Sequence, residues 1–297
     1  MKTLGKVLVL GATGIQGSSV VNFLHQQNIS VRALLLPHED TTPFTSKDIE
    51  VAVGSFADRE SLIKAFNGVE HCSLVFPLLY DWDLITQYAE NFIAAAKQSS
   101  VKSIVFNTSL PIFERSIGVV ANDIKLKFLQ RFLEEKLPVI TITPSFYLDN
   151  LTAPWSLPLI QEQGIIAYPL PDDAEFAWLS HFNLAQYTYH ALLHPELIGK
   201  TLEIGGELLT GPAIAKRITK IIGKEVRYVY TQPDDFAKQL EPQFGESVAA
   251  EIGNVYQFVK KYSHLFARFY RPEEAKTVFG FSLQTFDQWA QTIKWKG

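Results

Sequence analysis

Three glycines spaced three residues apart follow an apolar run near the start of the chain. The run Val7–Leu10 is continuously apolar, as in a strand buried on both faces, and the glycines come next in Gly11–Gly17 (GATGIQG). In such a loop Gly11 permits a tight turn, Gly14 lets backbone approach a pyrophosphate, and Gly17 lets a helix pack closely on the strand. The helix amino terminus would present unpaired N–H groups to the phosphates. The spacing therefore predicts a dinucleotide site.

The end of the second predicted strand normally decides between NAD and NADP. An acidic residue about 20 residues after the loop holds the ribose hydroxyls of NAD, whereas a basic residue meets the 2′-phosphate of NADP. Here the strand closes with Leu34–Pro37, and the first carboxylates, Glu39 and Asp40, come later. Arg32 and His38 are the nearby bases, and Arg32 lies early in the strand. The residues leave both cofactors, NADP and NAD, open.

The elements that would position this site alternate through the first half of the chain. Apolar runs that predict buried strands are Val7–Leu10, Val31–Leu36, Ile49–Val53, Cys72–Phe76, Ser103–Thr108 and Val139–Thr143. Asp81–Gln98 and Asn122–Lys136 carry apolar residues on one helical stripe. This alternation predicts an α/β fold with a doubly wound parallel sheet (a Rossmann fold) in the order 3-2-1-4-5-6. A ligand crevice would lie at the carboxyl ends of the strands.

The pattern changes after Phe146, where the alternation becomes irregular and prolines become frequent. We expect residues 1–150 to form the dinucleotide-binding Rossmann domain. Residues 151–297 would form a smaller mixed α/β lobe for substrate or partner, wrapped with the first as one compact unit. Elements expected in that lobe are strands at Ile165–Tyr168, Thr201–Ile204 and Val226–Tyr230 and helices at Asn183–Leu193, Gly211–Ile222 and Ala249–Tyr270.

Composition narrows the class of protein. The chain has 297 residues, 47% of them hydrophobic and 20% charged, which is enough to build a sizeable core. A net charge of −4 without a Lys/Arg cluster argues against direct binding of nucleic acid or an anionic membrane. The sequence contains no stretch of 18 apolar residues, so no membrane-spanning helix is predicted. The single cysteine, Cys72, excludes an internal disulfide and suits a cytoplasmic protein.

Other chemistries lack their motifs. Among seven histidines only His190 and His194 have a helical pair spacing, and no third ligand is evident, so no metal site is expected. The sequence has no Gly-x-Ser-x-Gly elbow, which a hydrolase would carry. Its glycine loop lacks the lysine that an NTPase requires.

The glycine loop and several later segments resemble the NmrA-like family, a branch of the short-chain dehydrogenase/reductase superfamily. Gln16, before the third glycine, is usual in that family's loop. Other segments that resemble it are Val31–Leu34, Pro144–Leu151, Thr210–Pro212, Val226–Val229 and Thr285–Trp289. The resemblance implies an NAD(P)-binding protein. Members include reductases of quinones or aromatic compounds, and also dinucleotide-binding redox sensors or transcriptional co-regulators.

Two positions depart from the family's pattern. NADP-preferring members carry arginine where Leu36 stands, so the usual phosphate clamp is absent. Many superfamily members have an adenine-contacting aspartate after the glycine that ends the third strand, whereas here Ser55 follows Gly54. Ser55 would replace that aspartate only in part.

The resemblance also implies a place for catalysis. Short-chain dehydrogenases carry Tyr and Lys four residues apart on the helix after the fifth strand. The lysine lowers the tyrosine pKa and holds the nicotinamide ribose, while the tyrosine gives a proton as hydride arrives. Lys125 stands at the position of the lysine, but Ala121 stands where the tyrosine would be. Lys125 would either contact the nicotinamide ribose or be a solvated surface residue. Ser109 resembles a substrate-ordering serine, and Tyr147 offers a phenol or an aromatic wall for the nicotinamide pocket.

The candidate residues divide into two groups. The catalytic candidates are Lys125, Ser109 and Tyr147, and the cofactor-binding candidates are Gly11, Thr13, Gly14, Ile15, Gln16, Gly17, Arg32, Ser55, Phe76, Pro77, Asn107 and Lys125.

Two functions fit these residues. The first is an NAD(P)H-dependent reductase of a small quinone-like or conjugated acceptor, because a quinone can take hydride without a strong protein acid. The second is a non-catalytic dinucleotide-binding redox sensor or co-regulator, with a protein partner that responds to cofactor state. The missing tyrosine favours the second function and is tolerable for the first.

Overall fold

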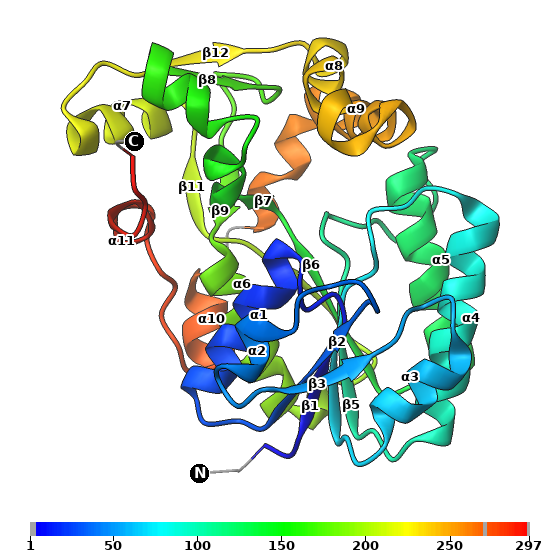
Figure 1. Ribbon diagram of the computed structural model, residues 1–297. Coiled ribbons are helices and arrows are strands. Elements are labelled where there is room, and N and C mark those ends of the chain that lie inside the picture. The colour runs from blue at the N-terminus through cyan, green and yellow to red at the C-terminus, as the bar shows by residue number, and fades with distance from the viewer. Residues whose placement is uncertain (1–3, 270–271, 296–297) are drawn as a thin grey trace. The chain divides into compact units, whose positions relative to one another are not determined.

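The computed structural model describes residues 4–269 and 272–295 (Figure 1). The chain folds as two compact units. The first unit comprises Met1–Arg115, Ile124–Thr143 and Leu184–Leu202, and the second comprises Ser116–Asp123, Pro144–Asn183 and Glu203–Gly297. The chain thus passes between the units repeatedly, whereas the sequence predicted one boundary near residue 150. Residues 184–202 return to the first unit.

The main sheet has seven strands in the order β10-β6-β5-β4-β1-β2-β3. Their bounds are β1 Val7–Val9, β2 Val31–Leu35, β3 Glu50–Val53, β4 His71–Leu74, β5 Ser103–Asn107, β6 Val139–Pro144 and β10 Thr201–Ile204. The pairs from β3 to β6 are parallel; Val7, for example, lies beside Val31 on one side and His71 on the other. The predicted α/β fold and strand order are confirmed.

The seventh strand, β10, corrects one expectation. The sequence placed Thr201–Ile204 in the second lobe, but β10 extends the main sheet beside β6. Backbone hydrogen bonds from Gly199 to Val139 (2.7 Å) and from Thr141 to Lys200 (2.9 Å) fix this pairing. A strand of four residues carries too little pattern to reveal which sheet it joins.

Helices cover both faces of this sheet (Figure 1). On one face lie α1 (Ile15–Gln26) and α6 (His181–Leu193), where the rings of Phe23 and Tyr189 are 5.7 Å apart. On the other lie α3 (Arg59–Phe66), α4 (Trp82–Gln98) and α5 (Val120–Glu134). The short helix α2 (Thr42–Thr45) precedes β3. Asp81 caps α4, accepting a hydrogen bond from the Leu84 N–H at 2.9 Å.

Phenylalanines fill the space under α3, α4 and α5. The ring of Phe76 is 4.6 Å from that of Phe128 and 4.8 Å from that of Phe56. Further rings of this cluster are those of Phe92, Phe106 and Phe132. Because each ring removes a large apolar surface from water, the cluster holds α4 and α5 against the end of β4.

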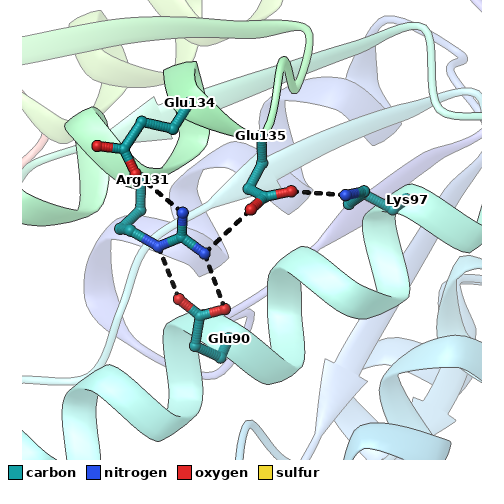
Figure 2. Close-up of polar contacts among 5 residues, drawn as sticks. All are labelled: Glu90, Lys97, Arg131, Glu134 and Glu135. Atoms are coloured by element: carbon teal, nitrogen blue, oxygen red, sulfur yellow. Dashed lines mark hydrogen bonds and ion pairs between the residues drawn. The ribbon is translucent and has the colours of Figure 1, made fainter.

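The outer faces of α4 and α5 are joined by ion pairs (Figure 2). Arg131 of α5 binds both carboxylate oxygens of Glu90 on α4, at 2.8 and 3.1 Å, and also binds Glu134 and Glu135. Glu135 in turn accepts a 2.5 Å hydrogen bond from Lys97 of α4. The carboxylates, Glu90 foremost, raise the pKa of the Arg131 guanidinium, so Arg131 keeps its charge.

Loss of this network is expected to weaken the fold modestly. Arg131→Met should lower the free energy of unfolding by about 1 kcal/mol at low salt, because bidentate exposed pairs contribute about that much. The loss should shrink in 0.5 M salt, since screening weakens exposed pairs. Urea unfolding at two salt concentrations measures both effects. Arg115→Met is the matched control, since Arg115 is exposed and no ion pair joins it to any described residue. Equal losses in the two variants would contradict the prediction.

The second unit has two small sheets. One has the order β11-β9-β7 and the other pairs β12 with β8. The bounds are β7 Phe146–Tyr147, β8 Ile165–Tyr168, β9 Phe176–Leu179, β11 Glu207–Leu209 and β12 Arg227–Tyr230. The helices are α7 Gly211–Ile222, α8 Pro233–Phe244, α9 Glu246–Lys261, α10 Pro272–Val278 and α11 Phe286–Gln291, with short helical turns at Leu148–Thr152, Leu159–Gln163, Ser263–Leu265 and Ala267–Phe269. A further short turn, Pro195–Leu197, belongs to the first unit.

One predicted helix of this unit is wrong in length. The sequence predicted a single helix over Ala249–Tyr270, but α9 ends at Lys261 and short turns follow. Tyr262 leaves the helical conformation with φ −127° and ψ 34°, which breaks the hydrogen-bond ladder. Tyr270 itself lies outside the described residues. None of the helices in the described ranges has both the length and the apolar character needed to cross a membrane.

Candidate functional site

The glycine loop has the geometry that its spacing predicts. Gly11 follows β1 with φ +74°, and α1 begins at Ile15, directly after Gly14. A β-carbon on Gly17 would lie 2.1 Å from the carbonyl oxygen of Gly11, so only glycine lets α1 start so close to the strand. Thr13, Gly14 and Ile15 are exposed.

The amino terminus of α1 is open to a ligand. No side chain caps this end of α1, and its first turn carries no acidic residue. Its backbone N–H groups therefore keep their capacity to bind an anion, and the helix dipole adds positive charge there. A β-carbon on Gly14 would meet protein only at 3.3 Å, from Gly11, so the outer side of Gly14 is free for a close approach. This cradle fits the pyrophosphate of a dinucleotide.

Three predicted residues meet between β5 and α1. The Asn107 amide donates to the side-chain oxygen of Gln16 at 2.7 Å, and the Ser109 hydroxyl donates to the same oxygen at 3.1 Å. The Ser109 backbone N–H also donates to the side-chain oxygen (Oδ1) of Asn107 at 2.8 Å, which holds Ser109 in a left-handed conformation with φ 62°. Gln16 thus ties the glycine loop to the carboxyl end of β5.

Lys125 is a buried amine on α5. Its exposed fraction is 6%, and its ammonium lies 5.7 Å from the ring of Phe76 and 6.0 Å from that of Phe128. No hydrogen bond or ion pair joins it to any other residue that the structure describes. Burial lowers the Lys125 pKa to about 8, because the charged form loses its hydration. A solvated surface lysine is therefore excluded.

The rest of this neighbourhood is apolar. Ala121, one turn before Lys125 on α5, is fully buried, so no phenol stands in the position of the dehydrogenase tyrosine. The side chain of Phe76 belongs to the aromatic cluster, whereas Pro77 is exposed just beyond it. Lys125 is thus a cation held over aromatic rings without a charged partner among the described residues.

Arg32 lies apart from these residues. It is the second residue of β2, whereas the glycine loop follows the opposite, carboxyl end of β1. Its guanidinium binds Glu50 at 2.6 Å and the carbonyl oxygens of Ala65 and Asn67 at 2.7 and 2.6 Å. These partners engage the Arg32 donors at the amino-terminal end of β2, so a cofactor contact by Arg32 stays a prediction.

The residues that follow β3 contact the Ser61 hydroxyl of α3. The Ser55 N–H donates to the Ser61 hydroxyl at 3.1 Å, and a β-carbon on Gly54 would lie 2.5 Å from the same hydroxyl oxygen. Ser55 is partly exposed at this edge of the sheet and stays a predicted cofactor contact.

Sequence reasoning did not select Glu39. This carboxylate accepts hydrogen bonds from the Thr13 hydroxyl and from the Leu36 N–H, both at 2.6 Å. The turn that returns it to β2 is closed by a hydrogen bond from the Glu39 N–H to the Leu36 carbonyl at 3.0 Å. Pro37, which favours the second position of such a turn, was the available signal.

Tyr147 belongs to the second unit, where it is buried at 5% exposure. Its ring lies 4.6 Å from that of His181, and the backbone N–H of His181 donates to the Asp149 carboxylate at 2.8 Å. A catalytic role for Tyr147 stays a prediction. No cluster of side chains suited to a metal ion is found within the described ranges.

The chain's family follows from a comparison of its sequence with family models. The model of the NmrA-like family matches residues 3–289. The chain belongs to the NmrA-like family. An NAD(P)H azoreductase of Xenophilus azovorans is 26% identical over 256 residues, covering 84% of this NmrA-like chain and 86% of the azoreductase.

Solved structures share the fold of this NmrA-like protein. The triphenylmethane reductase of Citrobacter sp., complexed with NADP(H), has a TM-score of 0.78 at 20% identity, covering 96% of this chain and 99% of the reductase. An NADPH-dependent quinone oxidoreductase of Escherichia coli, complexed with NADPH, has a TM-score of 0.76 at 18% identity, with coverage of 96% and 99%.

Proposed function

We propose that this NmrA-like protein is an NAD(P)H-dependent reductase of a small quinone-like or conjugated acceptor. The observation that carries the proposal is the open glycine loop, whose helix amino terminus has no capping side chain and whose Gly14 leaves room for a pyrophosphate. The similarity to an NAD(P)H azoreductase supports the reaction class, because an azo group is a conjugated acceptor of hydride.

The chain's own residues would divide the work as follows. The N–H groups of residues 15–17 bind the pyrophosphate, and Gln16, held by Asn107 and Ser109, fixes the loop against β5. Lys125 holds the nicotinamide ribose with its ammonium. The aromatic rings beneath Lys125 exclude water from one side of the amine and so strengthen its electrostatic effect. When bound, the dinucleotide supplies the hydride.

The acceptor class follows from what α5 lacks. Ala121 cannot donate a proton, so a simple carbonyl, whose reduction leaves a strongly basic alkoxide, is a poor substrate. A quinone gains hydride to give a hydroquinone anion that is stabilised by its own ring and later takes a proton from water. We therefore expect quinones and conjugated dyes to be better substrates than aldehydes and ketones.

The test is a fluorescence titration of the purified protein with NADPH and NADH, followed by addition of acceptors. Binding, and then loss of nicotinamide fluorescence with a quinone or an azo dye but not with an aldehyde of similar size, is the expected result. Failure of both dinucleotides to bind would overturn the proposal. Preference for the aldehyde would overturn the acceptor class.

A second function is favoured by the same alanine. A dinucleotide-binding redox sensor needs no proton donor, and the buried Ala121 removes the one that typical dehydrogenases use. Tight binding with no consumption of either dinucleotide across quinones, enones and azo dyes would establish this second function. It would then call for a search for a protein partner whose affinity changes with cofactor state.

A further inference from the structure

The loop after β2 returns a carboxylate to the glycine loop. Both oxygens of Glu39 are engaged, one by the Thr13 hydroxyl and the other by the Leu36 N–H, each at 2.6 Å. Leu36 directly follows the last residue of β2, and Thr13 lies within the loop expected to bind the pyrophosphate. Glu39 therefore lies at the carboxyl end of β2, although it comes late in the sequence.

This position has a defined meaning in the fold. In dinucleotide-binding Rossmann folds the adenosine ribose lies at the carboxyl end of the second strand, where an acidic side chain receives the ribose hydroxyls or a basic one meets a 2′-phosphate. The hydrogen bond from Thr13 shows that the Glu39 carboxylate accepts from a hydroxyl on the glycine-loop side. A ribose 2′-hydroxyl is a donor of the same kind.

The charges around Glu39 are unfavourable for a phosphate. The neighbouring Asp40 is also acidic, and the hydrogen bond from Thr42 lowers its pKa, so it stays ionised. Arg32 is held by Glu50 near the start of the strand. Lys47, the next lysine along the chain, donates to Asn22 at 2.9 Å. The segment 36–42 thus holds two carboxylates, one histidine (His38) and no lysine or arginine.

From this placement we infer that Glu39 makes the protein select NADH over NADPH. The carboxylate accepts hydrogen bonds from the ribose hydroxyls of NADH, in place of or beside that of Thr13. It repels the 2′-phosphate of NADPH and has no hydrogen to donate to it. The inference rests on the proposed function, because it concerns which dinucleotide enters the site.

The experiment compares the dissociation constants of NADH and NADPH for the wild-type protein and for Glu39→Gln. We expect wild type to bind NADH at least about tenfold more tightly, a difference of about 1.4 kcal/mol. Glu39→Gln keeps the size of the side chain and removes the charge, so the preference should fall at least about fivefold, chiefly through tighter NADPH binding. Thermal unfolding of the variant establishes that it is folded.

Asp40→Asn is the matched control. It removes the same charge one residue away, where the carboxylate accepts from the Thr42 N–H at 2.9 Å instead of facing the glycine loop. It should lower the preference much less than Glu39→Gln does, because only Glu39 accepts a hydrogen bond from the glycine loop, and a shift equal to that of Glu39→Gln would overturn the inference. Tighter binding of NADPH by wild type, or an unchanged ratio in Glu39→Gln, would overturn the inference alone. Binding of neither dinucleotide would overturn the proposed function as well.

Discussion

Replacing Lys125 with methionine is expected to stabilise the fold and to weaken dinucleotide binding. The Lys125 pKa falls from 10.5 to about 8 because the amine is buried without a counter-charge among the described residues. A shift of that size corresponds to about 3 kcal/mol of unfavourable burial of the charged form. Methionine fills a similar volume and packs well beside aromatic rings, so Lys125→Met should recover most of this free energy of unfolding at pH 7.

The gain should depend on pH in a definite direction. Below pH 8 the lysine is protonated in both folded and unfolded protein, so the wild type bears the full penalty. Between pH 8 and about 10.5 the unfolded chain binds the proton more strongly than the folded one, so wild-type stability rises with pH. The advantage of Lys125→Met should therefore be largest at pH 7 and should shrink toward pH 10.

Urea unfolding at several pH values measures this difference, and Lys127→Met is the matched control. Lys127 lies on the same helix with an exposed side chain, 5.4 Å from the ring of Trp82. It should show no gain in stability that varies between pH 7 and 10. A stability difference between wild type and Lys125→Met that did not change with pH would contradict the assignment of the buried charge.

The same substitution tests the functional role of Lys125. If the ammonium holds the nicotinamide ribose, the variant should lose affinity for the dinucleotide by about tenfold or more, as expected for a lost charge-assisted hydrogen bond. Wild-type affinity should weaken as pH rises through about 8, where the amine loses its proton, and that of the variant should not. Unchanged affinity in the variant would leave Lys125 without a part in binding.

The sequence predicted the sheet and the glycine loop because both depend on local patterns. Continuous apolar runs identify buried strands, and the strand order follows from how such folds connect their strands. The end of α9 and the placement of β10 depend on tertiary contacts, such as the hydrogen bond from Gly199 to Val139, that a short segment does not encode.

Site residues divide along the same line. Gln16 lies at the start of α1, and Asn107 and Ser109 lie at the carboxyl end of β5. The topology of the main sheet therefore brings these residues together. Arg32 and Glu39 were harder, because each depends on a partner in another segment. Glu50 engages Arg32 across the β2–β3 register, and a turn after Pro37 returns Glu39 to Leu36. Neither partner can be read from the spacing along the chain.

The glycines at 14 and 17 should respond to alanine in opposite ways. Gly17→Ala places a β-carbon 2.1 Å from the Gly11 carbonyl oxygen, so α1 must move away from β1. Backbone cannot yield as a flexible side chain does, and a clash of this kind is expected to lower the free energy of unfolding by about 3 kcal/mol. Gly14 has φ −69° and ψ 158°, which alanine adopts freely, and its β-carbon meets protein only at 3.3 Å.

Gly14→Ala should therefore change the free energy of unfolding by no more than about 0.5 kcal/mol, since the smaller freedom of alanine in the unfolded chain offsets a slightly tight 3.3 Å contact with the Gly11 carbonyl oxygen. Its β-carbon would occupy the space through which a pyrophosphate approaches the start of α1, so NADH affinity should fall about 30-fold, or about 2 kcal/mol. Urea unfolding and an NADH titration of the two variants separate these effects. If the Gly14→Ala protein is folded and binds NADH as tightly as wild type, the pyrophosphate does not bind at this loop. Intact stability in Gly17→Ala would instead mean that α1 can shift without disturbing the sheet.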